Sequence, residues 1–274
     1  MDYNKESIEL HEKIKGKLDV TLSTPINTKE DLSLIYSPGV AGPCLAIAED
    51  PSRDIDLTIK GRTVAVVSDG SAVLGLGNIG AAAAIPVMEG KAALFKKFAG
   101  PNAFPICLAT KDTEEIIRTV QLIAPVFGGV NLEDISAPRS FEIEQRLQDL
   151  GIPVFHDDQH GTAIVTLAGL MNACKVLGKH LSQLNVVING AGAAGNAITE
   201  LLRCQGHDHD SSQCITVKSV IVCDSKGIIS KDRTDLTPIK QKFLNYTNPN
   251  NRSGMLIDAM QNADVFIGVS VAIY

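Results

Sequence analysis

The chain has 274 residues, a net charge of −6 and 45% apolar residues. That length and apolar content are enough for one large domain or two ordinary domains with real cores. The negative charge argues against nucleic acid as the main partner, because phosphate binding requires a basic face. Small molecules or other proteins are therefore the expected partners.

The cysteine pattern and the N-terminus bear on the cellular compartment. The six cysteines lie far apart and form no CxxC pair, and four of them lie inside apolar segments, where a free thiol behaves as a small hydrophobe. This pattern predicts a reducing compartment. The N-terminus has no apolar core of signal-peptide type, and no uncharged run reaches the ~18 residues that a membrane span needs. The sequence thus predicts a soluble, cytoplasmic protein without a membrane partner.

The N-terminal segment at 4–18 is polar and charged. Residues 4–18 have a thin apolar stripe, which predicts a short amphipathic helix. Because such a helix is marginal alone, we expect it to pack on something else, for example a second subunit. Residues 36–43 contain two prolines and two glycines, which predicts a loop. Its first residue, Tyr36, is either a functional hydroxyl or a half-buried anchor of the loop.

A strand is predicted at 63–67, followed by a glycine-rich stretch and an alanine-rich helix. Pro86 and Gly90 are expected to interrupt that helix, so that a new helix starts at Lys91. At a helix start the positive end of the dipole disfavours a lysine charge. A neighbouring divalent cation would lower the pKa of Lys91 further, which favours it as a general base, whereas Lys96 and Lys97 lack this argument.

The rest of the first half alternates between strands and helices, which favours a parallel sheet with crossover helices. The further strands are predicted at 105–109, 126–132 and 152–155, and the helices at 113–123, with Thr113 as its N-cap, and 140–150.

The second half repeats the alternation and predicts a Rossmann-type sheet. Helices are predicted at 162–177, 196–203 and 255–261, strands at 184–189, 219–223 and 264–269, and a polar insertion at 205–213. The expected fold class is α/β: a substrate and metal domain at 1–160, then a partial, doubly wound nucleotide domain at 161–274.

The pattern GxGxxG occurs twice, at Gly75-Gly77-Gly80 and at Gly190-Gly192-Gly195. A dinucleotide site needs a strand that runs directly into the first glycine and an acid at the end of the next strand. Only the second pattern meets both conditions. We therefore expect the first pattern to serve tight backbone packing.

The second glycine pattern predicts the cofactor site, formed by Gly190, Gly192, Ala193, Ala194, Gly195 and Asp224. Asp224 would accept hydrogen bonds from the ribose hydroxyls and so favour NAD over NADP. Lys226 offsets the repulsion of a 2′-phosphate, so the choice between NAD and NADP stays open.

Two pairs of adjacent acids predict a metal site. Glu133 and Asp134 follow one strand and Asp157 and Asp158 follow the next, and ligands of open α/β sheets bind at such strand ends. Adjacent acids reach one ion only where the backbone turns, and residues 136–138, Ser-Ala-Pro, supply a turn.

We predict Glu133, Asp134 and Asp158 as ligands of Mg²⁺ or Mn²⁺, with Asp157 as a supporting acceptor. Zinc is disfavoured despite His156 and His160, because the site is rich in carboxylates and has no nearby cysteine. The alternative is that these acids are only solvated or cap helices.

Six motifs in family order make the chain resemble a malic enzyme of the compact bacterial type. They are YSPGVA at 36–41, SDGSAVLGLGNIG at 68–80, PVMEGKAALFKKFAG at 86–100, NLEDISAPRSFEIE at 131–144, FHDDQHGTAIV at 155–165, and NGAGAAG with VCDSKGII.

The resemblance implies oxidative decarboxylation of L-malate to pyruvate and CO₂ with reduction of NAD or NADP. It implies Tyr36 and Lys91 as catalytic residues, Glu133, Asp134 and Asp158 as metal ligands, and a homodimer or higher homo-oligomer. Lys91 would take the proton of the C2 hydroxyl, and Tyr36 would donate a proton to C3.

The family's nucleotide domain continues beyond the third strand, whereas this sequence stops at Tyr274. The sequence is therefore expected to be either a fragment of a longer protein or a shortened form of low activity. In both cases the incomplete sheet is expected to leave an unpaired edge. Two other hypotheses stay open: a truncated, catalytically poor homologue that only binds nucleotide or metal, and an amino-acid dehydrogenase, whose chemistry needs no metal.

Overall fold

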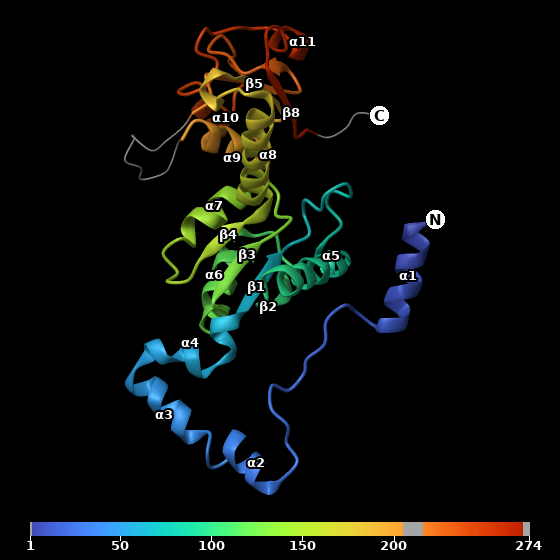
Figure 1. Ribbon diagram of the computed structural model, residues 1–274, viewed down its shortest axis with the longest axis vertical. Coiled ribbons are helices and arrows are strands. Elements are labelled where there is room, and N and C mark those ends of the chain that lie inside the picture. The colour runs from blue at the N-terminus through green and yellow to red at the C-terminus, as the bar shows by residue number, and fades with distance from the viewer. Residues whose placement is uncertain (1, 205–215, 271–274) are drawn as a thin grey trace. The chain divides into compact units, whose positions relative to one another are not determined.

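The computed structural model describes residues 2–204 and 216–270, and the polar insertion predicted at 205–213 falls outside them (Figure 1). The chain divides into two compact units after Phe155, and each unit is described by itself. Within the described ranges, no helix combines the length and the apolar character needed to cross a bilayer.

The first unit is built on a parallel sheet. Its strands are β1 (Thr63–Ser68), β2 (Asn102–Cys107) and β3 (Gly129–Leu132), with β4 (Val154–His156) at the division between the units. The strand order is β2-β1-β3-β4. Since β1 is parallel to both β2 and β3, the loops that leave these three strands lie at the same edge of the sheet.

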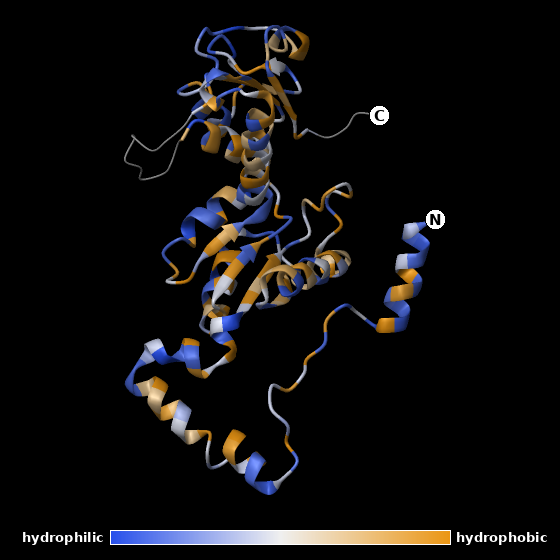
Figure 2. Cartoon of the chain, in the orientation of Figure 1, coloured by the Kyte–Doolittle hydropathy of each residue, from blue (hydrophilic) through white to orange (hydrophobic). Residues whose placement is uncertain are grey.

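Helices cover both faces of this sheet, because alternate residues of β1 point to opposite sides. Val66 packs with Met88 and Ala92 on one face, whereas Ala65 and Val67 pack against another hydrophobic cluster on the other. The helices are α5 (Ala81–Leu94), the π-helix η3 (Phe95–Ala99), α6 (Thr113–Ile123), η4 (Ala124–Val126) and α7 (Arg139–Arg146). Figure 2 shows the hydrophobic residues along the strands and α5.

Two predictions about the helices α5 and α6 were wrong. The alanine-rich helix does not break, since α5 continues through Pro86 and Gly90. Burial of Met88 and Ala92 against the sheet outweighs the helix-breaking tendency of the proline. The N-cap of α6 is Asp112, whose side chain accepts from the N–H of Glu115 at 3.0 Å, and not Thr113.

The N-terminal region is helical but exposed. It contains α1 (Tyr3–Ile14), α2 (Lys29–Ile35), α3 (Ala41–Glu49), η1 (Pro51–Arg53), α4 (Asp54–Leu57) and η2 (Ile59–Arg62). The loop predicted at 36–43 is shorter than expected, because α3 already begins at Ala41. None of residues 2–62 is buried, although many are large and apolar. Such a surface is typical of an interface.

The second unit has a sheet in the order β7-β6-β5-β8. Its strands are β5 (Asn185–Asn189), β6 (Ser219–Asp224), β7 (Gly227–Ile228) and β8 (Val265–Gly268). β6 and β8 lie on opposite sides of β5 and parallel to it, and β7 is antiparallel to β6. Among the described residues β8 is an edge strand, and Phe266 on it is 48% exposed.

Both faces of this sheet are again covered. Its helices are η5 (Asp157–Gly161, a π-helix), α8 (Thr162–Leu177), η6 (Leu181–Gln183), α9 (Ala193–Leu202), α10 (Pro238–Phe243) and α11 (Leu256–Ala259). Ile188 and Val222 pack with α8 and α9 on one face, and Val187 and Ile221 pack with Ala259 on the other. The parallel α/β class predicted from the sequence is confirmed.

Candidate functional site

Glu133 and Asp134 lie directly after β3 and are almost fully buried, with 5% and 3% exposure. The N–H of Glu133 still pairs with the carbonyl of Val67 in β1, at 2.9 Å. Asp134 then adopts a left-handed conformation with φ of 54°, which is uncommon for a residue other than glycine. The backbone therefore bends at Asp134 itself, and a turn at residues 137 and 138 follows within the range where the sequence predicted one.

The carboxylate of Glu133 has a defined set of partners. Nζ of Lys91 lies 3.0 Å from Oε1, and Nδ2 of Asn131 donates to Oε2 at 2.7 Å. The structure thus brings together two residues that the sequence predicted independently, Lys91 as a base and Glu133 as a metal ligand. Asn131, on β3, is a buried neighbour that the sequence analysis did not select.

The prediction that Lys91 starts a helix was wrong, because α5 passes directly into η3 and Lys91 lies within this helical run. The argument that the positive end of a helix dipole disfavours the charge of Lys91 therefore fails. The neighbouring Glu133 carboxylate favours the charged form of Lys91. The role of Lys91 as a base stays a prediction.

Asp158 follows β4 by two residues and is part of η5. Oδ2 of Asp158 lies 3.9 Å from Nδ1 of the fully buried His156. The carboxylate of Asp157 lies against Gly161 at the other end of η5, because a Cβ on Gly161 would overlap it. π-helical turns such as η5 are frequent at functional sites.

The predicted catalytic tyrosine lies elsewhere in the fold. Tyr36 is the C-cap of α2 and is 69% exposed. Among the described residues, no hydrogen bond or ion pair joins it to Lys91 or Glu133.

The first glycine pattern forms a tight turn. Val73 and Gly77 exchange backbone hydrogen bonds of 2.9 and 2.7 Å, and a Cβ on Gly70 would overlap the carbonyl of Gly80. No strand runs into this pattern. These contacts agree with its predicted role in backbone packing.

The second glycine pattern connects β5 to α9, as predicted. A Cβ on Gly195 would overlap the carbonyl of Gly190, and a Cβ on Gly190 would approach the backbone of Val269. Gly192 has φ of −90° and no atom near its missing Cβ. The chain itself therefore requires Gly190 and Gly195 but not Gly192, which is where a dinucleotide fingerprint needs space for a pyrophosphate.

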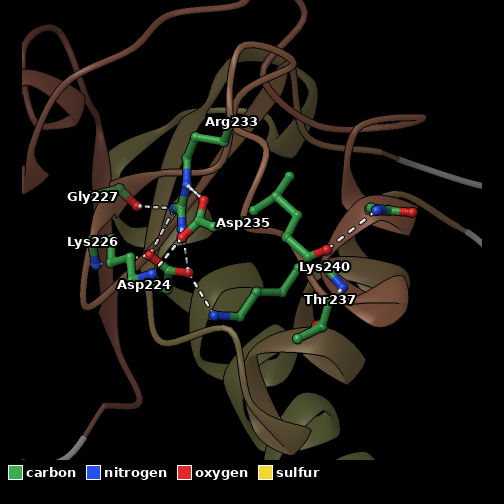
Figure 3. A network of polar contacts seen from close by, with 9 residues as sticks. Asp224, Lys226, Gly227, Arg233, Asp235, Thr237 and Lys240 are labelled. Atoms are coloured by element: carbon green, nitrogen blue, oxygen red, sulfur yellow. Dashed lines mark hydrogen bonds and ion pairs between the residues drawn. The ribbon is translucent and has the colours of Figure 1, made fainter.

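Asp224 ends β6, next to the glycine turn, because the N–H of Gly190 donates to the carbonyl of Cys223 at 2.9 Å. Its side chain is only 6% exposed and is held by cations (Figure 3). Arg233 donates to both oxygens, at 2.8 and 3.1 Å, and Lys240 donates at 2.6 Å. The N–H of Lys226 donates at 2.9 Å.

These contacts determine the charge of Asp224. Burial opposes the charged form, but the hydrogen bonds from Arg233, Lys240 and the N–H of Lys226 outweigh it and lower the pKa to about 2. The side chain of Lys226, which the sequence analysis named as able to offset the repulsion of a 2′-phosphate, pairs with Asp235 at 2.8 Å. The acid predicted to hold the ribose is therefore an ionised acceptor that already has several donors.

Comparison with known proteins gives the same family over almost the whole chain. The family model for the malic enzyme N-terminal domain matches residues 15–148, and the model for the malic enzyme NAD binding domain matches residues 159–273. The NAD-dependent malic enzyme of Geobacillus stearothermophilus is 58% identical over 94% of this chain and 52% of the relative. The bifunctional malic/malolactic enzyme of Bacillus subtilis is 53% identical over 99% of this chain and 64% of the relative.

A solved structure gives the same result. The NAD-dependent malic enzyme of Thermotoga maritima superposes with a TM-score of 0.87 at 48% identity, covering 96% of this chain and 71% of that one. The chain spans about half to two thirds of the length of the two curated relatives.

Proposed function

Because the chain belongs to the malic enzyme family, we propose that it carries out the oxidative decarboxylation of L-malate to pyruvate and CO₂, with NAD or NADP as hydride acceptor. The observation that carries the proposal is the pairing of Lys91 with Glu133 at 3.0 Å. The proposed base, Lys91, and an acid suited to bind a hard cation, Glu133, thus lie side by side at the carboxyl end of a parallel sheet.

We propose Glu133, Asp134 and Asp158 as the ligands of one Mg²⁺ or Mn²⁺ ion. Each of the three offers a carboxylate oxygen that could reach the same ion. All three donors are hard oxygens, which fit these cations better than zinc. When bound, the ion would stabilise negative charge on the oxygens of the substrate.

The protein's own groups would move the protons. Lys91 would accept the proton of the C2 hydroxyl as hydride leaves for the nicotinamide, and Tyr36 would donate a proton to C3 after CO₂ has left. The cofactor would lie on the Gly190-to-Gly195 turn, with its pyrophosphate beside Gly192 and the N-terminus of α9. Asp224 would lie near the adenosine ribose.

We also propose that the protein is cytoplasmic and forms a homodimer or a larger homo-oligomer. The exposed apolar residues of the first 62 positions support a subunit contact there. A monomeric mass by light scattering would contradict this part of the proposal.

The test is malate-dependent reduction of NAD or NADP, measured with Mn²⁺ and again after EDTA. Pyruvate formed only with the metal supports the proposal. Cofactor binding by calorimetry without any pyruvate, whatever the metal, would favour a homologue that only binds. Turnover of an amino acid in the presence of EDTA would favour an amino-acid dehydrogenase.

A further inference from the structure

Arg139, the first residue of α7, connects loops that follow three neighbouring strands. Its Nη1 lies 2.7 Å from Oδ2 of Asp69, in the loop after β1. The same nitrogen donates to the carbonyl of Lys111, after β2, at 2.9 Å. Nη2 donates to Oγ of Ser71 at 2.9 Å and to Oγ of Ser136, after β3, at 3.0 Å. One guanidinium thus binds all three loops.

The partner of this arginine is a fully buried carboxylate. The side chain of Asp69 has 0% exposure, and its Oδ1 accepts from the N–H and the Oγ of Ser71 at 3.0 and 2.6 Å. Removing Arg139 would leave a buried charge without its counterion, which is strongly unfavourable. We call Asp69, Ser71 and Arg139 the loop clamp.

The loop clamp holds the backbone on both sides of the turn at Asp134. The N–H of Ala72, next to Ser71, donates to the carbonyl of Asp134 at 3.0 Å. The N–H of Ser136 donates to Oγ of Ser71 at 2.9 Å. Asp134 lies between these two attachments in its left-handed conformation, which costs on the order of 1 kcal/mol and persists only where its surroundings impose it.

We infer that the loop clamp is a positioning device for the metal ligands. It holds Asp134 in a turned conformation that lets the carboxylates of two adjacent residues reach one ion, since extended backbone would point them to opposite faces. Arg139 is thus a positioning residue that acts through Asp134. The inference rests on the proposed metal site at Glu133, Asp134 and Asp158.

The experiment compares two arginines of the same helix. Arg139→Met removes the arginine of the loop clamp. Arg146→Met is the matched control, because Arg146 ends α7 and pairs with the exposed Glu114 and Glu142. The dissociation constant for Mn²⁺ is measured without substrate, by electron paramagnetic resonance of the free ion. Circular dichroism reports the fold of each variant.

Arg139→Met is expected to weaken Mn²⁺ binding about 10- to 100-fold, as is usual when the support of a metal ligand is lost. Arg146→Met is expected to bind as the wild type does. Arg139→Lys is expected to lie in between, because an ammonium can neutralise Asp69 but cannot reproduce the planar fork of donors. At saturating Mn²⁺, the kcat of Arg139→Met should lie closer to its wild-type value than the Mn²⁺ affinity of the variant does.

A folded Arg139→Met protein with wild-type Mn²⁺ affinity would overturn the inference. If Arg139→Met does not fold, Ser71→Ala decides the question, because it removes the link to Ser136 and leaves the Arg139–Asp69 pair in place. Weaker Mn²⁺ binding by Ser71→Ala supports the inference, and unchanged binding overturns it. A wild-type protein that binds no Mn²⁺ would instead refute the proposed metal site.

Discussion

Replacing Asp224 with asparagine should destabilise the second unit. The Asp224 side chain is 6% exposed and accepts from both Arg233 and Lys240. The variant Asp224→Asn keeps the shape of the side chain but removes its charge. Among the described residues, Arg233 then keeps one carboxylate partner, Asp235 at 2.9 Å, and Lys240 loses its counterion.

The magnitude follows from the pKa of Asp224. A fall from 3.8 to about 2 corresponds to about 2 kcal/mol of stability at neutral pH. Breaking a buried pair costs up to ~3–5 kcal/mol, because the partner cations stay behind. Since the folded-state pKa is lowered, this stability is present above pH ~4 and is lost as the pH falls through about 2.

The assay is urea unfolding followed by circular dichroism, with hydrogen exchange at the β6 amides to follow the second unit separately. The difference between wild type and Asp224→Asn should be constant from pH 5 to 8 and shrink as the pH approaches 2. Asp235→Asn is the control, because it removes a more exposed acid, 35% exposed, from the same arginine and should cost much less. Equal effects of the two substitutions, or a difference that does not change with pH, would refute the reasoning.

The remaining predictions concern the glycine turn and the base. Gly195→Ala should destabilise the protein without cofactor, because its Cβ overlaps the carbonyl of Gly190, whereas Gly192→Ala should unfold like the wild type and lose only NAD affinity. Thermal unfolding and calorimetry test this pair, and equal stability of the two variants would contradict it. Lys91→Ala should lower kcat by about 10²- to 10⁴-fold, whereas Lys97→Ala, at an exposed position of η3, should not. Unchanged steady-state kinetics in Lys91→Ala would exclude its catalytic role.

The elements that the sequence predicted well are those whose structure is specified by residues within them or next to them in the sequence. The apolar residues of β5, Val186 to Ile188, and the glycines that follow the strand specify a buried strand and a turn within a few residues. The same holds for β6 and the acid at its end. Their observed bounds, Asn185–Asn189 and Ser219–Asp224, lie within a residue of the prediction.

The features that the sequence did not predict depend on contacts far along the chain. Pro86 does not end α5, because the helix is stabilised by packing on the sheet. Asp134 adopts its left-handed conformation between hydrogen bonds to the loop around Ser71, which is distant in the sequence. Likewise Asp224 is held by Arg233 and Lys240, 9 and 16 residues further on, and no pattern of spacing marked these two cations.

The most direct test of the account is a product assay with L-malate, Mn²⁺ and NAD or NADP, run on the wild type, Glu133→Gln and Glu142→Gln. Glu142 is the control because it is exposed on α7 and pairs with Arg146. The account predicts equal amounts of pyruvate, CO₂ and reduced cofactor in the wild type and in Glu142→Gln, and a Mn²⁺ requirement raised at least ~10-fold in Glu133→Gln. Reduced cofactor without CO₂, or turnover that neither EDTA nor Glu133→Gln affects, would contradict it.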